Sequence, residues 1–155
     1  PTVIILIKNN DKILLARSKN WKQNLYSCIA GFCEPNESLE QTVIREAYEE
    51  VGINSKYVKL IKSSDEWYKY DVPEKSRRKI LINKNFKGQK QKWFLFRLKE
   101  SVKISFENDP DNEFDDFKWV SYWYPLAVIV SFKEAVYRKA LNELKYAYCS
   151  EFSDV

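Results

Sequence analysis

Three glutamates in the first half of the chain have a spacing that would place their carboxylates side by side. Glu46, Glu49 and Glu50 lie in the run LEQTVIREAYEEV, and on an ideal helix they occupy one arc of about 100°. Like charges spaced three and four residues apart repel one another and weaken a helix. Carboxylate oxygens are ligands that suit hard divalent cations, commonly together with substrate phosphates. The spacing therefore favours a divalent-metal site, and a solvated acidic helix face is the alternative.

The glutamates belong to a longer motif that runs from Gly31 to Ile53. The chain matches the pattern G-x5-E-x7-R-E-U-x-E-E-x-G-U, in which U is aliphatic, at every fixed position. This pattern is the Nudix box, so the chain resembles the Nudix hydrolases. The resemblance implies an α/β fold, an α/β/α sandwich with a mixed central sheet, and Mg²⁺ or Mn²⁺ as cofactor. It also implies a metal site at Gly31, Glu46, Glu49 and Glu50, supported by a pair between Glu37 and Arg45.

The expected helix of the motif carries a signal at each end. Ser38 is followed three residues later by Gln41, which is the spacing of a capping box in the first turn. Gly52 comes directly after the helical pattern, where the left-handed C-cap conformation is least costly for glycine. The face opposite the glutamates is expected to be buried and consists of Val43, Ile44, Ala47 and Val51.

Length and composition indicate one domain, residues 1–155, with a hydrophobic core. The chain is 45% hydrophobic with a net charge of +4, and it has no histidine. The lack of histidine excludes histidine nucleophile triads, metal ligands and general bases, so acid–base chemistry falls to carboxylates, lysine, tyrosine or water. The three cysteines lack a paired spacing and fit a reducing compartment. Because no apolar run is long enough to span a membrane, a cytoplasmic protein is expected.

The elements that must position the motif follow from the apolar patterns around it. Strands are predicted at residues 2–8 and 12–17 (a hairpin), 26–30, 57–70 (one or two strands), 93–98, 102–106 and 117–120. An amphipathic helix is predicted at 131–148, and Pro125 is expected to block an earlier helix. A basic loop is predicted at residues 73–88, and an acidic loop is predicted at residues 108–116.

The second half of the chain resembles one group within the family, the bacterial RNA pyrophosphohydrolases, which are also described as dinucleoside polyphosphate hydrolases. The resemblance lies in WYKYDVP (67–73), GQKQKWF (88–94), EFDDFKWVSYWYP (113–125) and SFKEAVYRKA (131–140). It implies attack of water on a nucleoside 5′-polyphosphate linkage, with an RNA 5′ end or a dinucleoside polyphosphate as substrate.

Two alternatives to this substrate class remain open. YSCIAGFCE (26–34) resembles the NADH pyrophosphatase branch, although residues 63–73 lack the S-Q-P-W-P-F-P-x-S array of that branch. A Nudix domain that only senses nucleotides is the second alternative, and the intact motif argues against it. NADH is therefore kept as a competing substrate.

Residues outside the motif complete the predicted site. Glu113 matches a loop glutamate of the RNA pyrophosphohydrolases, so the resemblance implies a metal ligand or base that acts beside the catalytic Glu49 and Glu50. Basic side chains suit a polyphosphate or RNA backbone, and aromatic rings suit base stacking, with burial in the core as the alternative for each ring. The predicted substrate-binding residues are Arg17, Tyr70, Arg77, Arg78, Lys90, Lys92, Phe132 and Lys133.

Overall fold

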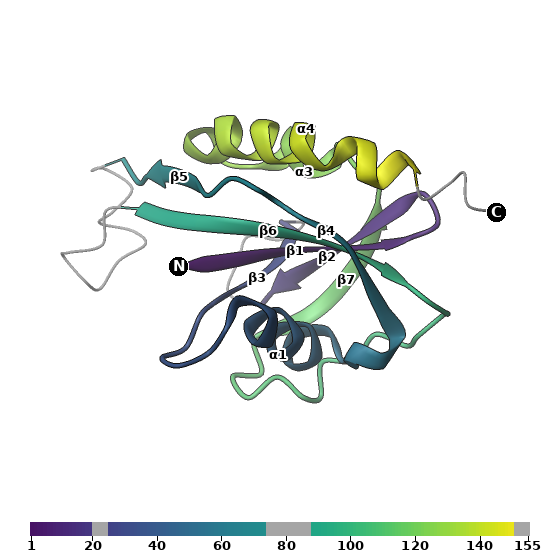
Figure 1. Ribbon diagram of the computed structural model, residues 1–155. Coiled ribbons are helices and arrows are strands. Elements are labelled where there is room, and N and C mark those ends of the chain that lie inside the picture. The colour runs from purple at the N-terminus through teal and green to yellow at the C-terminus, as the bar shows by residue number, and fades with distance from the viewer. Residues whose placement is uncertain (20–24, 74–87, 151–155) are drawn as a thin grey trace.

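A mixed β-sheet lies between layers of helices in the computed structural model, which describes residues 1–19, 25–73 and 88–150. The strands are β1 (Thr2–Asn9), β2 (Lys12–Ser18), β3 (Ser27–Phe32), β4 (Val58–Ser63), β5 (Tyr68–Asp71), β6 (Gly88–Leu98) and β7 (Phe114–Val120). Among the described residues, the helices are α1 (Leu39–Val51), α3 (Tyr124–Val128) and α4 (Glu134–Ser150), with 3₁₀ turns η1 (Ser55–Tyr57) and η2 (Ser131–Lys133). Figure 1 shows α1 on one face of the sheet and α3 and α4 on the other. The predicted α/β/α sandwich with a mixed sheet is confirmed.

Strand β1 lies inside the sheet and explains why the sheet is mixed. It runs parallel to β6, with Ile5 opposite Phe94, and antiparallel to β3. Side chains alternate along a strand, so the apolar run of β1 supplies both faces. Ile4 belongs to the core cluster that includes Leu144 of α4, whereas Ile5 belongs to the cluster that includes Val51 of α1. The two helices are thereby fixed on opposite faces of the same strand.

The local sequence accounts for both ends of α1. The Ser38 hydroxyl accepts a hydrogen bond from the Gln41 N–H at 3.1 Å, and the Gln41 side chain accepts one from the Ser38 N–H at 2.8 Å. Gly52 has a φ of 73° and ends the helix in the left-handed conformation. The predicted capping box and C-cap are both confirmed.

The buried face of α1 is rotated relative to the predicted one. Ile44, expected to be buried, is 47% exposed, whereas Glu50, expected on the polar face, is 9% exposed. Glu50 follows Val43 by seven positions, and seven residues at about 100° each return to within about 20° of the starting direction. Glu50 therefore points with Val43 toward the sheet, and Ile44 lies at the edge of the buried stripe.

Several predicted strand boundaries are wrong. β6 begins at Gly88 and not at 93, and β7 begins at Phe114 and not at 117, because both strands continue through polar residues that still pair with a neighbouring strand. Residues 102–106 form no strand: Ser105 donates its N–H to the Val51 carbonyl at the end of α1, at 3.0 Å. Apolar and polar residues alternate in this segment because every second side chain packs into the core beneath α1.

Pro125 begins a helix and does not block one. It lies in the first turn of α3, where a missing backbone N–H removes no helical hydrogen bond. The amphipathic helix predicted for 131–148 is confirmed as η2 followed by α4, whose buried residues are Val136, Tyr137, Ala140, Leu141, Leu144 and Tyr148. Within the described ranges, no helix has the length and hydropathy needed to cross a lipid bilayer.

Candidate active site

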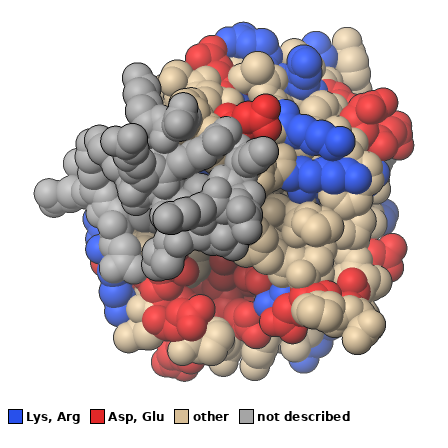
Figure 2. Space-filling view, turned by 90° about the vertical axis from the view of Figure 1, so that its left-hand side faces the viewer, with Lys and Arg blue, Asp and Glu red and all other residues tan. Residues whose placement is uncertain are grey.

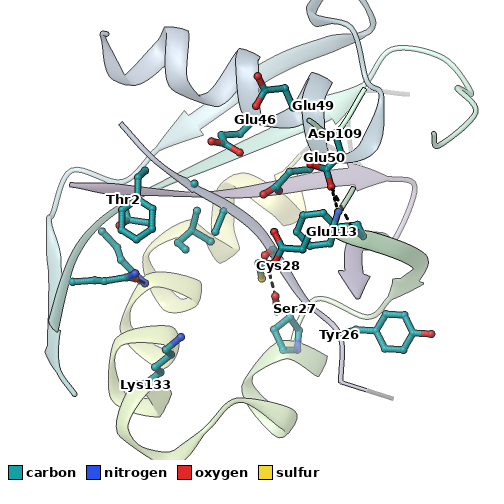
Figure 3. A pocket seen from close by; sticks show the side chains of 18 of the residues that line it. Thr2, Tyr26, Ser27, Cys28, Glu46, Glu49, Glu50, Asp109, Glu113 and Lys133 are labelled. Atoms are coloured by element: carbon teal, nitrogen blue, oxygen red, sulfur yellow. Dashed lines mark hydrogen bonds between the residues drawn. The ribbon is translucent and has the colours of Figure 1, made fainter. Parts of the chain in front are cut away.

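A cavity of about 910 Å³ opens between α1, β3, the loop before β7 and the turn that leads into α4. Glu46, Glu49 and Glu50 of α1 and Glu113 of the loop lie at one end of it (Figure 3), and Figure 2 shows acidic side chains around a hollow on this face of the molecule. We call this the acidic end. The lining also includes Thr2, Gln89, Gln91 and Lys133, and Figure 3 shows Lys133 away from the glutamates. The structure thus brings the four predicted carboxylates to one cavity.

The glycine that opens the motif makes room for one of these carboxylates. Gly31 lies in β3, and a Cβ at this position would be 2.1 Å from Cδ of Glu46 and 2.4 Å from its Oε1. Any side chain at this position would therefore displace the Glu46 carboxylate. Glycine is required here by close approach and not by backbone conformation.

Arg45 joins the carboxylates of the motif to one another. Its Nε lies 2.8 Å from Oε2 of Glu37, and its Nη1 lies 2.7 Å from Oε1 of Glu46 and 3.3 Å from Oε2 of Glu49. Its Nη2 donates to the Phe32 carbonyl at 3.0 Å. The predicted pair of Glu37 and Arg45 is thus present, and the guanidinium also offsets the repulsion within α1.

The pairing changes the titration of Glu37. Hydrogen bonds from Arg45 and then from Thr42 lower the pKa of Glu37 from 4.5 to about 2, against a smaller opposing effect of burial. A carboxylate with a depressed pKa contributes stability above its unfolded-state pKa, and this contribution is lost as the pH falls through the folded-state value. The contribution of Glu37 is therefore expected to disappear between about pH 4.5 and pH 2.

Replacing Glu37 with glutamine should lower the free energy of unfolding at pH 7 and flatten its decline below pH 4.5. The measurement is urea unfolding at pH 7 and at several values down to pH 2.5. Glu100→Gln, at an exposed glutamate outside this network, is the control and should keep the wild-type pH profile. Equal profiles for Glu37→Gln and wild type would contradict the assignment.

Glu50 is a buried carboxylate with an unsatisfied oxygen. Burial, and next the negative charge of Glu46, raise its pKa well above the ordinary value, and Glu113 adds to the effect. Within the described part of the chain, its Oε2 has no hydrogen-bond partner. A buried anion without a partner is costly and is stabilised by a cation placed against it.

The residues of the acidic end fit a divalent cation in ligand type. They supply carboxylate oxygens, including the unsatisfied oxygen of Glu50. Within the described ranges no three acidic or cysteine side chains surround a common point, and Arg45 pairs with both Glu46 and Glu49. A cation bound by these two carboxylates would therefore compete with the guanidinium for them.

Glu113 reaches the cavity from a loop that is fixed by a residue the sequence did not single out. The Asp109 carboxylate accepts hydrogen bonds from the N–H groups of Glu113 at 2.7 Å and Phe114 at 3.3 Å. The Glu113 carbonyl accepts from the N–H of Lys19 at 2.8 Å. Asp109 also lines the cavity, so it supports both the loop and the acidic surface.

The predicted basic residues fall at different places. Lys133 lines the cavity, and burial lowers its pKa. Lys90 and Lys92 share one side of β6, and their ammonium groups lie 4.5 and 5.5 Å from the centroid of the Trp67 ring and not in the cavity. Arg17 pairs with Asp115 at 3.0 Å, also outside the cavity lining. Arg77 and Arg78 lie outside the described residues.

The two predicted stacking residues pack on each other. The ring centroids of Tyr70 and Phe132 are 5.7 Å apart, and Tyr70, which is 8% exposed, belongs to a small core with Val72 and Val136. Neither ring lines the cavity. The structure places them in the core, which was the alternative for each ring.

The polar cavity residues that the sequence analysis did not single out include Thr2, Gln89 and Gln91. A signal for the two glutamines was present in the sequence. Side chains alternate along a strand, so residues 89 and 91 must face the same way as Trp93, which is fully buried. Polar side chains in line with a buried indole indicate a pocket at that face.

Comparison with known proteins agrees with this fold. The NUDIX domain pattern matches residues 1–140, and the chain belongs to the Nudix family. Curated relatives narrow the group. An RNA pyrophosphohydrolase of Francisella philomiragia is 40% identical over 146 residues, which cover 92% of this chain and 90% of the relative. One from Cellvibrio japonicus is 39% identical over 149 residues, 96% of this chain and 87% of the relative. The predicted membership of the Nudix family and the predicted enzyme class, a hydrolase that acts on pyrophosphate bonds, are confirmed.

Solved structures confirm the fold alone. The Escherichia coli dihydroneopterin triphosphate pyrophosphohydrolase has a TM-score of 0.68 and 18% identity, with 91% of this chain and 94% of that chain covered. A Caenorhabditis elegans Ap4A hydrolase has a TM-score of 0.61 and 17% identity, with coverages of 93% and 95%. At such identities the shared architecture carries no information on substrate.

Proposed function

We propose that this protein hydrolyses the 5′-triphosphate end of RNA to a 5′-monophosphate, and that dinucleoside polyphosphates are a second substrate. The observation that carries the proposal is a cavity with the motif carboxylates at one end and Lys133 away from them. The acidic end suits a phosphate chain bridged by cations, and the opposite end is left for the nucleoside. Relatives at about 40% identity named RNA pyrophosphohydrolase support the RNA assignment.

The chemistry is assigned to the acidic end. Glu46, Glu49, Glu50, Glu113 and Gly31 would hold Mg²⁺ or Mn²⁺, which would supply the Lewis acidity that activates water and offsets phosphate charge. Glu113, which reaches the cavity from its loop, would act as a metal ligand or as the base that accepts the proton of the attacking water. Glu49 and Glu50 orient the reacting groups, and Arg45 with Glu37 fixes the loop against α1.

The substrate is held by positive charge and by shape. Lys133 supplies a positive charge inside the cavity, away from the acidic end. Lys90 and Lys92 with Trp67 form a basic and aromatic surface on the other side of β6 that suits the RNA strand beyond its 5′ end. A cytoplasmic location agrees with an RNA substrate.

A second candidate function, hydrolysis of NADH, rests on the YSCIAGFCE segment that leads into the motif. The two candidate functions predict different values of kcat/KM for RNA and for NADH. With Mg²⁺ present, we expect 5′-triphosphorylated RNA to be converted to 5′-monophosphorylated RNA, dinucleoside tetraphosphate to be cut as well, and NADH to be cut poorly. The three substrates are assayed side by side. A tenfold or larger advantage for NADH would show that the RNA assignment is wrong.

A further inference from the structure

Two acidic side chains of the loop before β7, Asp109 and Glu113, reach the acidic end of the cavity. Both line it, and Figure 3 shows both close to Glu50. The negative charge of Glu113 is one of the causes that raise the pKa of Glu50, so these two carboxylates interact. Two carboxylates of one loop are therefore candidates for contact with a metal ion or the substrate, and their hydrogen bonds separate their roles.

The carboxylate of Asp109 is engaged by the backbone of its own loop. Its Oδ1 accepts a hydrogen bond from the N–H of Asp111 at 3.1 Å. Its Oδ2 accepts from the N–H groups of Glu113 at 2.7 Å and Phe114 at 3.3 Å. An ionised carboxylate has about four acceptor sites, so three are used here. Hydrogen bonds to an ionised group are roughly twice as strong as neutral ones, so these contacts hold the Asp109 oxygens toward the loop.

The backbone of Glu113 is fixed on both sides. Its N–H is bonded to Asp109, and its carbonyl accepts a hydrogen bond from the N–H of Lys19 at 2.8 Å. The preceding residue, Asn112, has a φ of 48°, a conformation that asparagine tolerates, and its N–H donates to the Asp109 carbonyl at 3.1 Å. Because both of its backbone groups are held, the direction of the Glu113 side chain is set before any substrate binds.

We propose that Asp109 is a positioning residue that acts on the reaction only through Glu113. It holds the backbone of Glu113 so that this carboxylate meets the glutamates of α1, and it does not itself bind the metal ion or the substrate. Such positioning affects the rate strongly, because a misplacement of about 1 Å is enough to cost about 100-fold. The inference rests on the role given to Glu113 in the proposed function.

Two substitutions separate the hydrogen bonds of Asp109 from its charge. Asp109→Ala removes both, whereas Asp109→Asn removes the charge and keeps one oxygen that can accept from the N–H groups of Glu113 and Phe114. Each is made in wild type and in Glu113→Gln, and thermal unfolding sets a temperature at which every variant is folded. Glu107→Ala removes one negative charge at an exposed residue outside the cavity lining and is the control.

The kinetic measurement is kcat and KM in Mg²⁺ for 5′-triphosphorylated RNA, dinucleoside tetraphosphate and NADH. Asp109→Ala should lower kcat by about tenfold or more with little change in KM. Asp109→Asn should stay within about threefold of wild type, and Glu107→Ala should equal it. In the Glu113→Gln background, Asp109→Ala should have no further effect, because two residues that act as one unit are not additive.

Three kinetic results would overturn the inference. Wild-type kcat in Asp109→Ala would show that the loop contacts do not affect the reaction. Equal losses from Asp109→Ala with and without Glu113→Gln would show that Asp109 acts independently of Glu113. A loss in Asp109→Asn as large as in Asp109→Ala would show that its charge acts directly. This last comparison needs only the Asn variant if Asp109→Ala fails to fold, since a loss beyond about threefold then counts against the inference.

A second measurement does not depend on activity. Amide hydrogen exchange at Glu113 and Phe114, followed by NMR without substrate, should be slow in wild type and Asp109→Asn and at least about tenfold faster in Asp109→Ala. Equal exchange rates in all three proteins would contradict the anchoring. Failure of the proposed function is distinguishable: if RNA is not converted to a 5′-monophosphate, that function fails, and the substitutions are then compared on whichever of the other substrates is cut.

Discussion

Glu50→Gln is expected to lower kcat on 5′-triphosphorylated RNA by about 100-fold or more, the scale of losing a key electrostatic or acid–base group. The same substitution should leave the metal-free protein at least as stable as wild type. Both effects have one cause. Glu50 is buried beside Glu46 with an unsatisfied oxygen, so its charge is unfavourable to the fold without a cation. Glutamine keeps the shape and removes the charge.

The experiment pairs steady-state kinetics in Mg²⁺ with thermal unfolding in EDTA. Glu40→Gln, at an exposed glutamate of the same helix, should leave kcat unchanged. Excess EDTA should abolish turnover by wild type, because the glutamates alone provide no charge to offset the phosphates. Full turnover in EDTA, or a Glu50→Gln variant with wild-type kcat, would contradict the assignment of a metal site to these glutamates.

Gly31→Ala is expected to reduce kcat by about 100-fold while the protein stays folded. The new methyl group would lie 2.1 Å from Cδ of Glu46 and must push this carboxylate aside. The obstructed atoms belong to the end of a flexible side chain, so the backbone of β3 need not move. A catalytic group misplaced by about 1 Å is enough to cost 100-fold in rate.

Substitution of a second glycine, Gly52, is expected to lower stability and to leave activity unchanged. Gly52 has a φ of 73°, and a Cβ there would lie 2.8 Å from the Ser105 carbonyl oxygen. Gly52→Ala should therefore lower the free energy of unfolding by about 1 kcal/mol or more, with kcat kept at a temperature where the variant is folded. Activity and chemical denaturation are measured for both variants. Stability loss in Gly31→Ala equal to that in Gly52→Ala would contradict the separation of the two roles.

The sequence predicted those parts of the site that depend on neighbours along the chain. The capping of α1 at Ser38, its end at Gly52 and the pair of Glu37 and Arg45 all involve residues within one contiguous motif. The same local reasoning failed for Glu50. Its burial depends on which stripe of α1 faces the sheet, and that is set by packing against β1 and β3.

The parts that could not be predicted depend on contacts between distant segments. The anchoring of the Glu113 loop by Lys19 joins two residues that are far apart in the sequence, and no spacing rule relates them. Tyr70 and Phe132 were expected to stack on a base, but the pairing of β5 with β6 brings Tyr70 under the start of α4, where the two rings bury each other. Strand alternation was the one available signal for Gln89 and Gln91.

Arg45 occupies the position of a counter-ion among the motif carboxylates, and this separates the order of folding from the order of metal loading. A newly made chain can close the loop and α1 around its own guanidinium, so it need not wait for a cation to fold. Many small metal-dependent domains differ, because their ligands come together only around the ion. A cation that binds the glutamates would then have to displace Arg45 from them. The free energy of the arginine–glutamate pairs would lower the affinity of the site for the cation. We therefore expect Arg45→Ala to lower the concentration of divalent cation needed for half-maximal activity.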